Sequence, residues 1–118
     1  MLPHLQCDIV RQCADAVAQL TCEMQDEAEL FASPNTLQHV ETHLLTVAQT
    51  LAHLSPALQA RLAWVDWRGW QALGALLEAD AQPRSEAVWY AVRSLLPTTV
   101  HLIEQLRRIE PVWFENAY

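Results

Sequence analysis

Apolar residues recur every three or four positions along most of the chain, which is the spacing of one face of an α-helix. The strongest stripe lies within residues 35–54 and consists of Leu37, Val40, Leu44, Val47, Leu51 and Leu54. A helix with such a stripe packs one face along its neighbours in a bundle. No segment alternates apolar and polar residues as a half-buried strand does. The pattern therefore predicts an all-α fold.

The N-terminal half contains two further predicted segments. A first helix is expected over residues 3–26, because proline is tolerated at a helix start and an apolar stripe follows it. Residues 26–34 are expected to form a connection, since Pro34 biases the preceding residue away from the helical conformation. After the strong stripe, Ser55 is expected to cap a short helix that has Pro56 at its first position.

Two longer helices are predicted in the C-terminal half. Asp66 is expected to cap a helix over residues 67–79, which a polar loop over residues 80–84 follows. Ser85 is then expected to cap the last long helix. Pro97 lies inside that helix and predicts a kink, because proline removes one backbone hydrogen bond. These elements predict an up-and-down bundle of four to five helices.

The composition fits one domain and restricts its binding partners. We expect residues 1–118 to form a single domain, because the length suits one and no composition shift marks a boundary. The chain carries seven arginines, no lysine and a formal net charge of −7. RNA binding is therefore not expected, since the field of an acidic chain repels phosphate.

The lack of a recognisable targeting signal and the spacing of the cysteines predict a cytoplasmic protein without a cofactor. No apolar stretch approaches the roughly 18 residues of a membrane span, and no basic segment followed by an apolar one opens the chain. We therefore expect neither membrane association nor a signal peptide. Cys7, Cys13 and Cys22 form no C-x-x-C pair, so reduced thiols are expected.

Two histidines provide the best metal-like spacing. His39 and His43 lie four residues apart on one face of a predicted helix, a spacing that can bind zinc. Val40 stands where the H-E-x-x-H motif of metalloproteases has its glutamate. Because no third ligand is evident nearby, we expect no metal site.

Arg93 and His101 are the candidate catalytic residues. An arginine can bind phosphate while a histidine moves a proton, which is the chemistry of phosphodiester cleavage. Their separation corresponds to about 12 Å along a straight helix. They would converge only through a kink at Pro97 or across a dimer. The alternative interpretation is an exposed arginine and a capping or interface histidine.

Aromatic residues are candidates for packing or for partner binding. Trp64, Trp67 and Trp70 lie close together in the sequence, and core packing is favoured over an exposed aromatic patch. The last residues, 110–118, are expected to leave the helix and either dock on the bundle or meet a second chain. The candidate partner-binding residues are Trp89, Trp113, Phe114 and Tyr118.

Several short motifs follow one another in a distinctive order. They are Phe31-Ala32-Ser33-Pro34, Leu54-Ser55-Pro56-Ala57-Leu58, Asp66-Trp67-Arg68, Val88-Trp89 and Leu96-Pro97. This order is similar to the HepT-like branch of the HEPN family, over about residues 5–109. The resemblance implies a helical bundle that dimerises. Many members are ribonuclease toxins, so it also implies a minimal nucleotidyltransferase antitoxin as the partner.

The chain departs from that family at the active site. The resemblance implies an arginine, four to six further residues and a histidine, commonly followed by a tyrosine, on the helix after Trp67-Arg68. The corresponding positions hold Gly74, Ala79 and Ala81. None of the family's catalytic residues can therefore be carried over to this chain.

The second predicted helix departs in the same way. Leu45 and Gln49 stand where family members often carry glutamates. We therefore expect a degenerate, non-catalytic protein, a pseudo-ribonuclease that binds a partner in a toxin–antitoxin-type system. One alternative is an active ribonuclease toxin with a shifted site at Arg93, His101 or Arg84. Another is a helical dimer that binds a nucleotide or small ligand, with arginines at the pocket mouth.

Overall fold

Four long helical rods form the body of the protein. The computed structural model describes residues 2–114. The rods are α1 (Pro3–Thr21), α3 (Pro34–Ala52), α5 (Trp67–Glu78) and the continuous stretch of α6 (Ser85–Tyr90), the π-helical turn η1 (Ala91–Leu95) and α7 (Leu96–Ile109). The shorter elements are α2 (Glu27–Phe31), α4 (Pro56–Arg61) and the 3₁₀ turn η2 (Pro111–Phe114).

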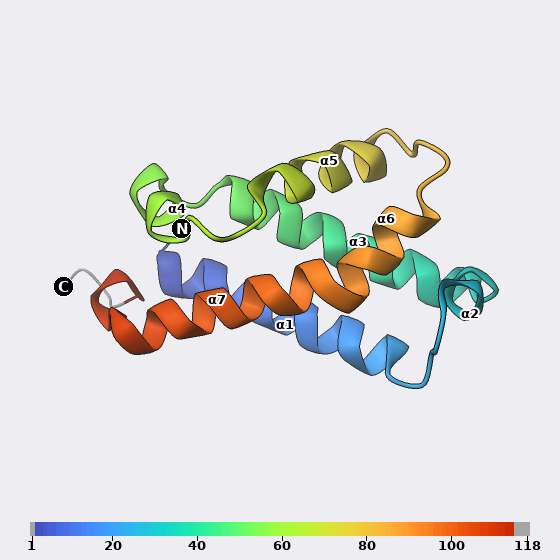
Figure 1. Ribbon diagram of the computed structural model, residues 1–118, viewed down its shortest axis with the longest axis horizontal. Helices are drawn as coiled ribbons and strands as arrows, with labels where there is room; N and C mark the ends of the chain where they lie inside the picture. The colour runs from blue at the N-terminus through green and yellow to red at the C-terminus, as the bar shows by residue number, and fades with distance from the viewer. Residues whose placement is uncertain (1, 115–118) are drawn as a thin grey trace.

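The rods alternate in direction. In Figure 1, α1 and α5 run one way along the long axis, whereas α3 and the α6–α7 stretch run the other way. The short helices α2 and α4 lie at opposite ends. Residues 2–114 contain no strand. The predicted all-α, up-and-down bundle is confirmed.

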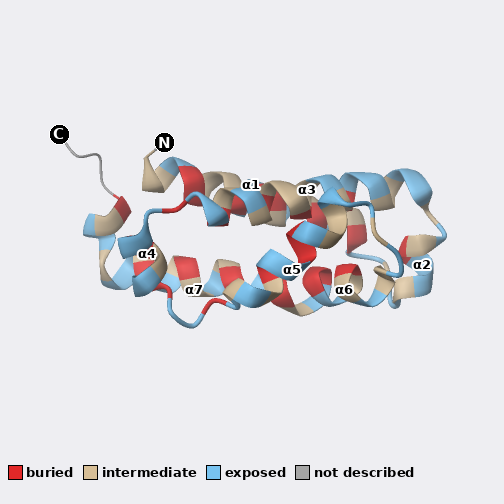
Figure 2. Cartoon of the chain, turned by 90° about the horizontal axis from the view of Figure 1, so that it is seen from above, coloured by how far each residue is buried: buried red, intermediate tan, exposed pale blue. Residues whose placement is uncertain are grey.

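The apolar stripe of α3 lies at the centre of the core. Val40, Leu44 and Val47 have no exposed surface, and Leu51 is almost completely buried. Helices α1 and α5 both pack on α3, so this stripe faces neighbours along its length. Figure 2 shows the buried residues facing inward between the helices. Burying each such side chain contributes about 1.5–3 kcal/mol.

Small residues bring α5 close to α3. Gly74 is buried, and a Cβ atom added to it would lie 3.4 Å from the Cβ of Ala48. An alanine at this position would therefore make an ordinary van der Waals contact with Ala48. The position that would hold a catalytic arginine under the family resemblance is therefore part of a helix–helix contact here.

One buried hydrogen-bond relay joins α5 to α7. The Trp70 indole Nε1–H donates to the Thr99 hydroxyl at 2.9 Å, and that hydroxyl donates to the Leu95 carbonyl at 2.7 Å. Trp70 and Thr99 are almost fully buried. Because a buried polar group without a partner is costly, the relay allows an indole N–H to lie within an apolar core.

A widened helical turn lies directly before Pro97, where the sequence predicts a kink. Pro97 has no N–H to donate, and η1 lies directly before the Leu96-Pro97 pair. The backbone N–H of Leu96 reaches the Ala91 carbonyl, five residues back, as in a π-helix. The regular hydrogen-bonding pattern of the rod is therefore interrupted at this point.

Two of the predicted helix caps are confirmed. The Ser55 side chain accepts a hydrogen bond from the Leu58 N–H, and the Asp66 carboxylate accepts one from the Gly69 N–H. Gly69 also leaves space for this cap, since a Cβ there would lie 2.5 Å from Asp66 Oδ2. The start of α5 is thus fixed by residues that are adjacent in the sequence.

Two boundaries differ from the sequence prediction. The first helix ends at Thr21 rather than residue 26, and α2 occupies part of the predicted connection. Helix α2 forms because the Asp26 carboxylate accepts from the Glu29 N–H. The N-cap of α6 is Arg84 rather than Ser85, which is the first helical residue and makes no side-chain cap.

Replacing Thr99 with valine tests the buried relay. Thr99→Val keeps the shape of the side chain but leaves the Trp70 N–H in the core without its acceptor. We expect the free energy of unfolding to fall by about 1–3 kcal/mol. Thr98→Val on the exposed face of α7 is the matched control and should have little effect. Equal losses for both variants in chemical denaturation would contradict the relay.

Candidate functional site

Arg93 and His101 lie on one helical stretch and do not meet. Arg93 is on η1, and its Cζ lies 5.2 Å from the centre of the Trp89 ring, a cation–π contact. His101 is exposed on α7. Eight positions separate the two residues, which is about 12 Å along a straight helix. A single chain therefore does not place them side by side.

Arg84 is held by two carboxylates. Its Nε and Nη2 donate to Glu41 at 2.6 and 3.1 Å, and its Nη1 donates to Asp80 at 2.7 Å. The hydrogen bond with Glu41 raises the pKa of Arg84 above its usual range. The guanidinium thus ties the loop between α5 and α6 to α3. Its donors are engaged by protein carboxylates rather than free to bind phosphate.

The Arg84 cluster is expected to stabilise the fold measurably. Arg84→Met should lower the free energy of unfolding by about 2–3 kcal/mol, since breaking even a partly buried pair strands a carboxylate. Arg11→Met is the matched control, because Arg11 is exposed and lies 3.5 Å from Glu104. Its loss should be about 0–1 kcal/mol. Equal losses in urea denaturation would show that Arg84 is an ordinary surface arginine.

The histidine pair and the cysteines offer little chemistry. His39 is exposed and His43 half-buried, and the described part of the chain has no group of three or more His, Cys, Asp and Glu side chains suited to a metal ion. Cys7 and Cys13 are buried, and Cys22 is exposed. Burial raises the pKa of the Cys7 thiol to about 11, which keeps it protonated at neutral pH.

The predicted partner-binding aromatics are largely packed. Phe114 is buried, with the Arg107 guanidinium over its ring, and Trp113 is half-buried and donates its Nε1–H to Glu110. Trp89 is half-buried beside Arg93. Tyr118 lies outside the described residues. Residues 111–114 therefore dock on the bundle, which was one of the two expected arrangements.

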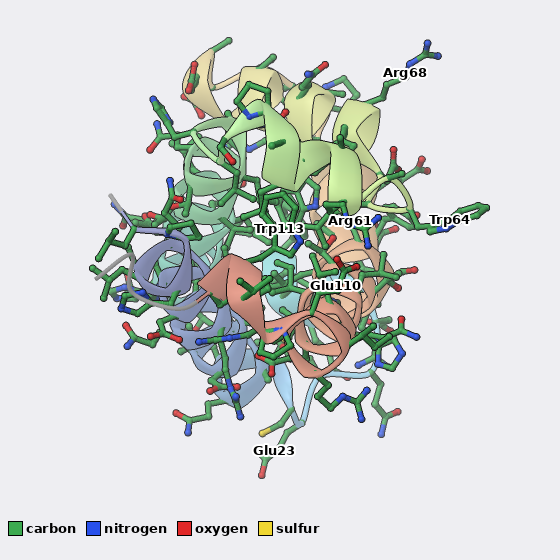
Figure 3. The ribbon with its side chains drawn as sticks, turned by 90° about the vertical axis from the view of Figure 1, so that its left-hand side faces the viewer. Glu23, Arg61, Trp64, Arg68, Glu110 and Trp113 are labelled. Atoms are coloured by element: carbon green, nitrogen blue, oxygen red, sulfur yellow. The ribbon has the colours of Figure 1, made fainter. Side chains whose placement is uncertain are left out.

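The structure separates three tryptophans that sequence reasoning grouped together. Trp70 lies in the core, and Trp67 is half-buried with its Nε1–H donated to the Leu62 carbonyl. Trp64 is 89% exposed and points away from the body of the protein (Figure 3). One feature of the sequence could have indicated that Trp64 is exposed. Trp64 precedes the Asp66 cap and so lies outside the helix whose stripe is buried.

An apolar hollow lies beside Trp64. It has a volume of about 310 Å³ and is lined by Leu62, Leu102, Leu106, Ile109, Gln105 and the ion pair of Arg61 with Glu110. Ile109 is exposed over two thirds of its surface. Figure 3 shows Arg61 and Glu110 between α4 and α7, with Trp64 extending outward beside them. We call Trp64 and this hollow the Trp64 surface.

A second hollow, the α3–α5 cleft, lies at the place that the family resemblance assigns to catalysis. Its volume is about 440 Å³, and it is bounded by α3, α5 and one residue of α4. Gly74, Gln49 and Glu78 are among its lining residues. None of the described residues that line it is an arginine. The cleft therefore lacks the guanidinium that would bind phosphate under the family resemblance.

Comparison with protein-family models, with curated proteins and with solved structures gives no match for this chain. The similarity to the HepT-like HEPN family thus rests on the sequence motifs given above. Among the helices formed by residues 2–114, none combines the length and apolar character needed to cross a membrane.

Proposed function

We propose that the chain is a degenerate HepT-like HEPN protein that acts as a protein-interaction module without ribonuclease activity. It dimerises in the cytoplasm and binds a minimal nucleotidyltransferase in a toxin–antitoxin-type system. The helical bundle and the order of the sequence motifs support this assignment. The glycine and alanines at the family's catalytic positions, together with the separation of Arg93 from His101, support the loss of catalysis.

The exposure of Trp64 is the observation that carries the proposal. In the free chain, nearly all the surface of the Trp64 indole ring is in water, so the ring gains none of the free energy that its burial would contribute. Burying it against a partner recovers that energy. Interface hot spots are enriched in tryptophan and arginine next to apolar pockets, and the Trp64 surface combines Trp64, Arg61 and an aliphatic hollow.

Changing Trp64 should abolish partner binding without unfolding the protein. Tagged wild-type chain is used to capture proteins from its own host after RNase treatment, and mass spectrometry identifies them. We expect a nucleotidyltransferase to be retained by the wild type and lost with Trp64→Ala, a change of about 2 kcal/mol or more in binding. Tyr90→Ala is the matched control, because Tyr90 is an exposed aromatic residue on α6.

Three outcomes would contradict the proposal. Recovery of the wild-type chain alone would contradict the proposed partner. Equal capture by Trp64→Ala and wild type would show that the partner does not bind at the Trp64 surface. The third is RNA cleavage by the purified chain that stops in Arg93→Ala or His101→Ala. That result would establish the alternative of a ribonuclease with a relocated site.

A further inference from the structure

The α3–α5 cleft has the dimensions of a small-molecule site. Its volume of about 440 Å³ falls within the roughly 300–1,000 Å³ typical of ligand pockets. The walls are mixed rather than apolar, since glutamine, histidine and glutamate side chains line it together with Trp67. Small residues keep it open: Ala48, Ala52, Gly74 and Ala75.

Glu78 gives the cleft an uncompensated negative charge. It is the one carboxylate among the described residues that line the cleft, and no arginine of residues 2–114 forms an ion pair with it. Its hydrogen-bond donor is Gln49 Nε2, at 3.4 Å. Glu78 is also the last residue of α5, where the helix carbonyls add partial negative charge and no basic residue lies in the last turn.

Two further polar side chains of the cleft, those of His53 and Gln59, bond to backbone carbonyls. His53 Nδ1 lies 2.7 Å from the Gln49 carbonyl oxygen. Because a carbonyl oxygen can only accept, the His53 Nδ1–H donates to it. Gln59 donates its Nε2 hydrogens to the Leu51 and Leu54 carbonyls, which leaves its amide oxygen as an acceptor.

An aromatic wall completes the site. Trp67 lines the cleft, and its indole N–H is already donated to the Leu62 carbonyl. The ring therefore contributes an apolar, electron-rich surface and no further donor. Such a surface attracts organic cations through the ring quadrupole.

We propose that the α3–α5 cleft binds a small organic cation of the guanidinium or primary-amine class, held by Glu78 and the amide oxygens of Gln49 and Gln59 against the Trp67 ring. A cation rich in N–H donors matches a carboxylate and two amide oxygens. Nucleotides do not match, because Glu78 repels phosphate and no arginine of the described chain lines the cleft. This site shares no lining residue with the Trp64 surface, so its test is independent of the proposed partner.

Calorimetry with agmatine tests the inference, since agmatine carries a guanidinium and an ammonium group. We expect the full chain to bind agmatine and Glu78→Gln to weaken binding about tenfold or more, as for loss of a charge-assisted hydrogen bond. Glu23→Gln is the matched control, because Glu23 is exposed and lies far from the cleft (Figure 3). Ala75→Phe, at an exposed cleft position, should fill the space and abolish binding.

The same titrations can overturn the inference. The absence of binding heat at millimolar agmatine would contradict the proposal that the cleft binds an organic cation. Equal weakening by Glu78→Gln and Glu23→Gln would show that agmatine responds to the overall charge of −7 rather than to the cleft. Binding of AMP in place of agmatine, lost in Ala75→Phe, would show that the cleft selects anions.

Discussion

The hydrogen bond from the Trp70 indole to the Thr99 hydroxyl is the buried polar contact that ties α5 to the last rod of the bundle. Helix α5 rests on α3 through a small-residue contact at Gly74, and it reaches α7 across the core through Trp70. The Thr99 hydroxyl donates in turn to the carbonyl of Leu95, the last residue of the π-helical turn that precedes Pro97. The largest buried side chain and the irregular turn of the last rod are thus coupled.

Helix α5 and the segment that leads into it each contribute to one of the two surfaces to which we assign binding. Its Asp66 cap starts the helix so that Trp70 turns inward, while Trp64, two residues before the cap, is left in solvent. Its other end places Glu78 at the α3–α5 cleft. The Trp64 surface is apolar apart from Gln105 and the Arg61–Glu110 ion pair, whereas the α3–α5 cleft has mixed walls and one carboxylate. The two proposed binding surfaces therefore share no lining residue.

Local patterns in the sequence predicted most of the fold. The α3 stripe and the Ser55 and Asp66 caps depend on residues within a few positions of one another, so they could be recognised without a structure. Arg84 at the start of α6 could not, because its partner Glu41 lies far away in the sequence. The exposure of Trp64 was missed because burial is the usual fate of tryptophan. The α3–α5 cleft could not be predicted either, because its lining residues come from separate helices and form no contiguous sequence motif.

Hydroxyl-radical footprinting of the free chain and of its captured complex is the most direct test of the central claim that Trp64 anchors a partner. In the free chain, Trp64 should be the most readily oxidised tryptophan and Trp70 the most protected, following their exposure. In the complex, oxidation of Trp64 should fall steeply while that of Tyr90 stays unchanged. Trp64 oxidised as fully in the complex as in the free chain would contradict the account.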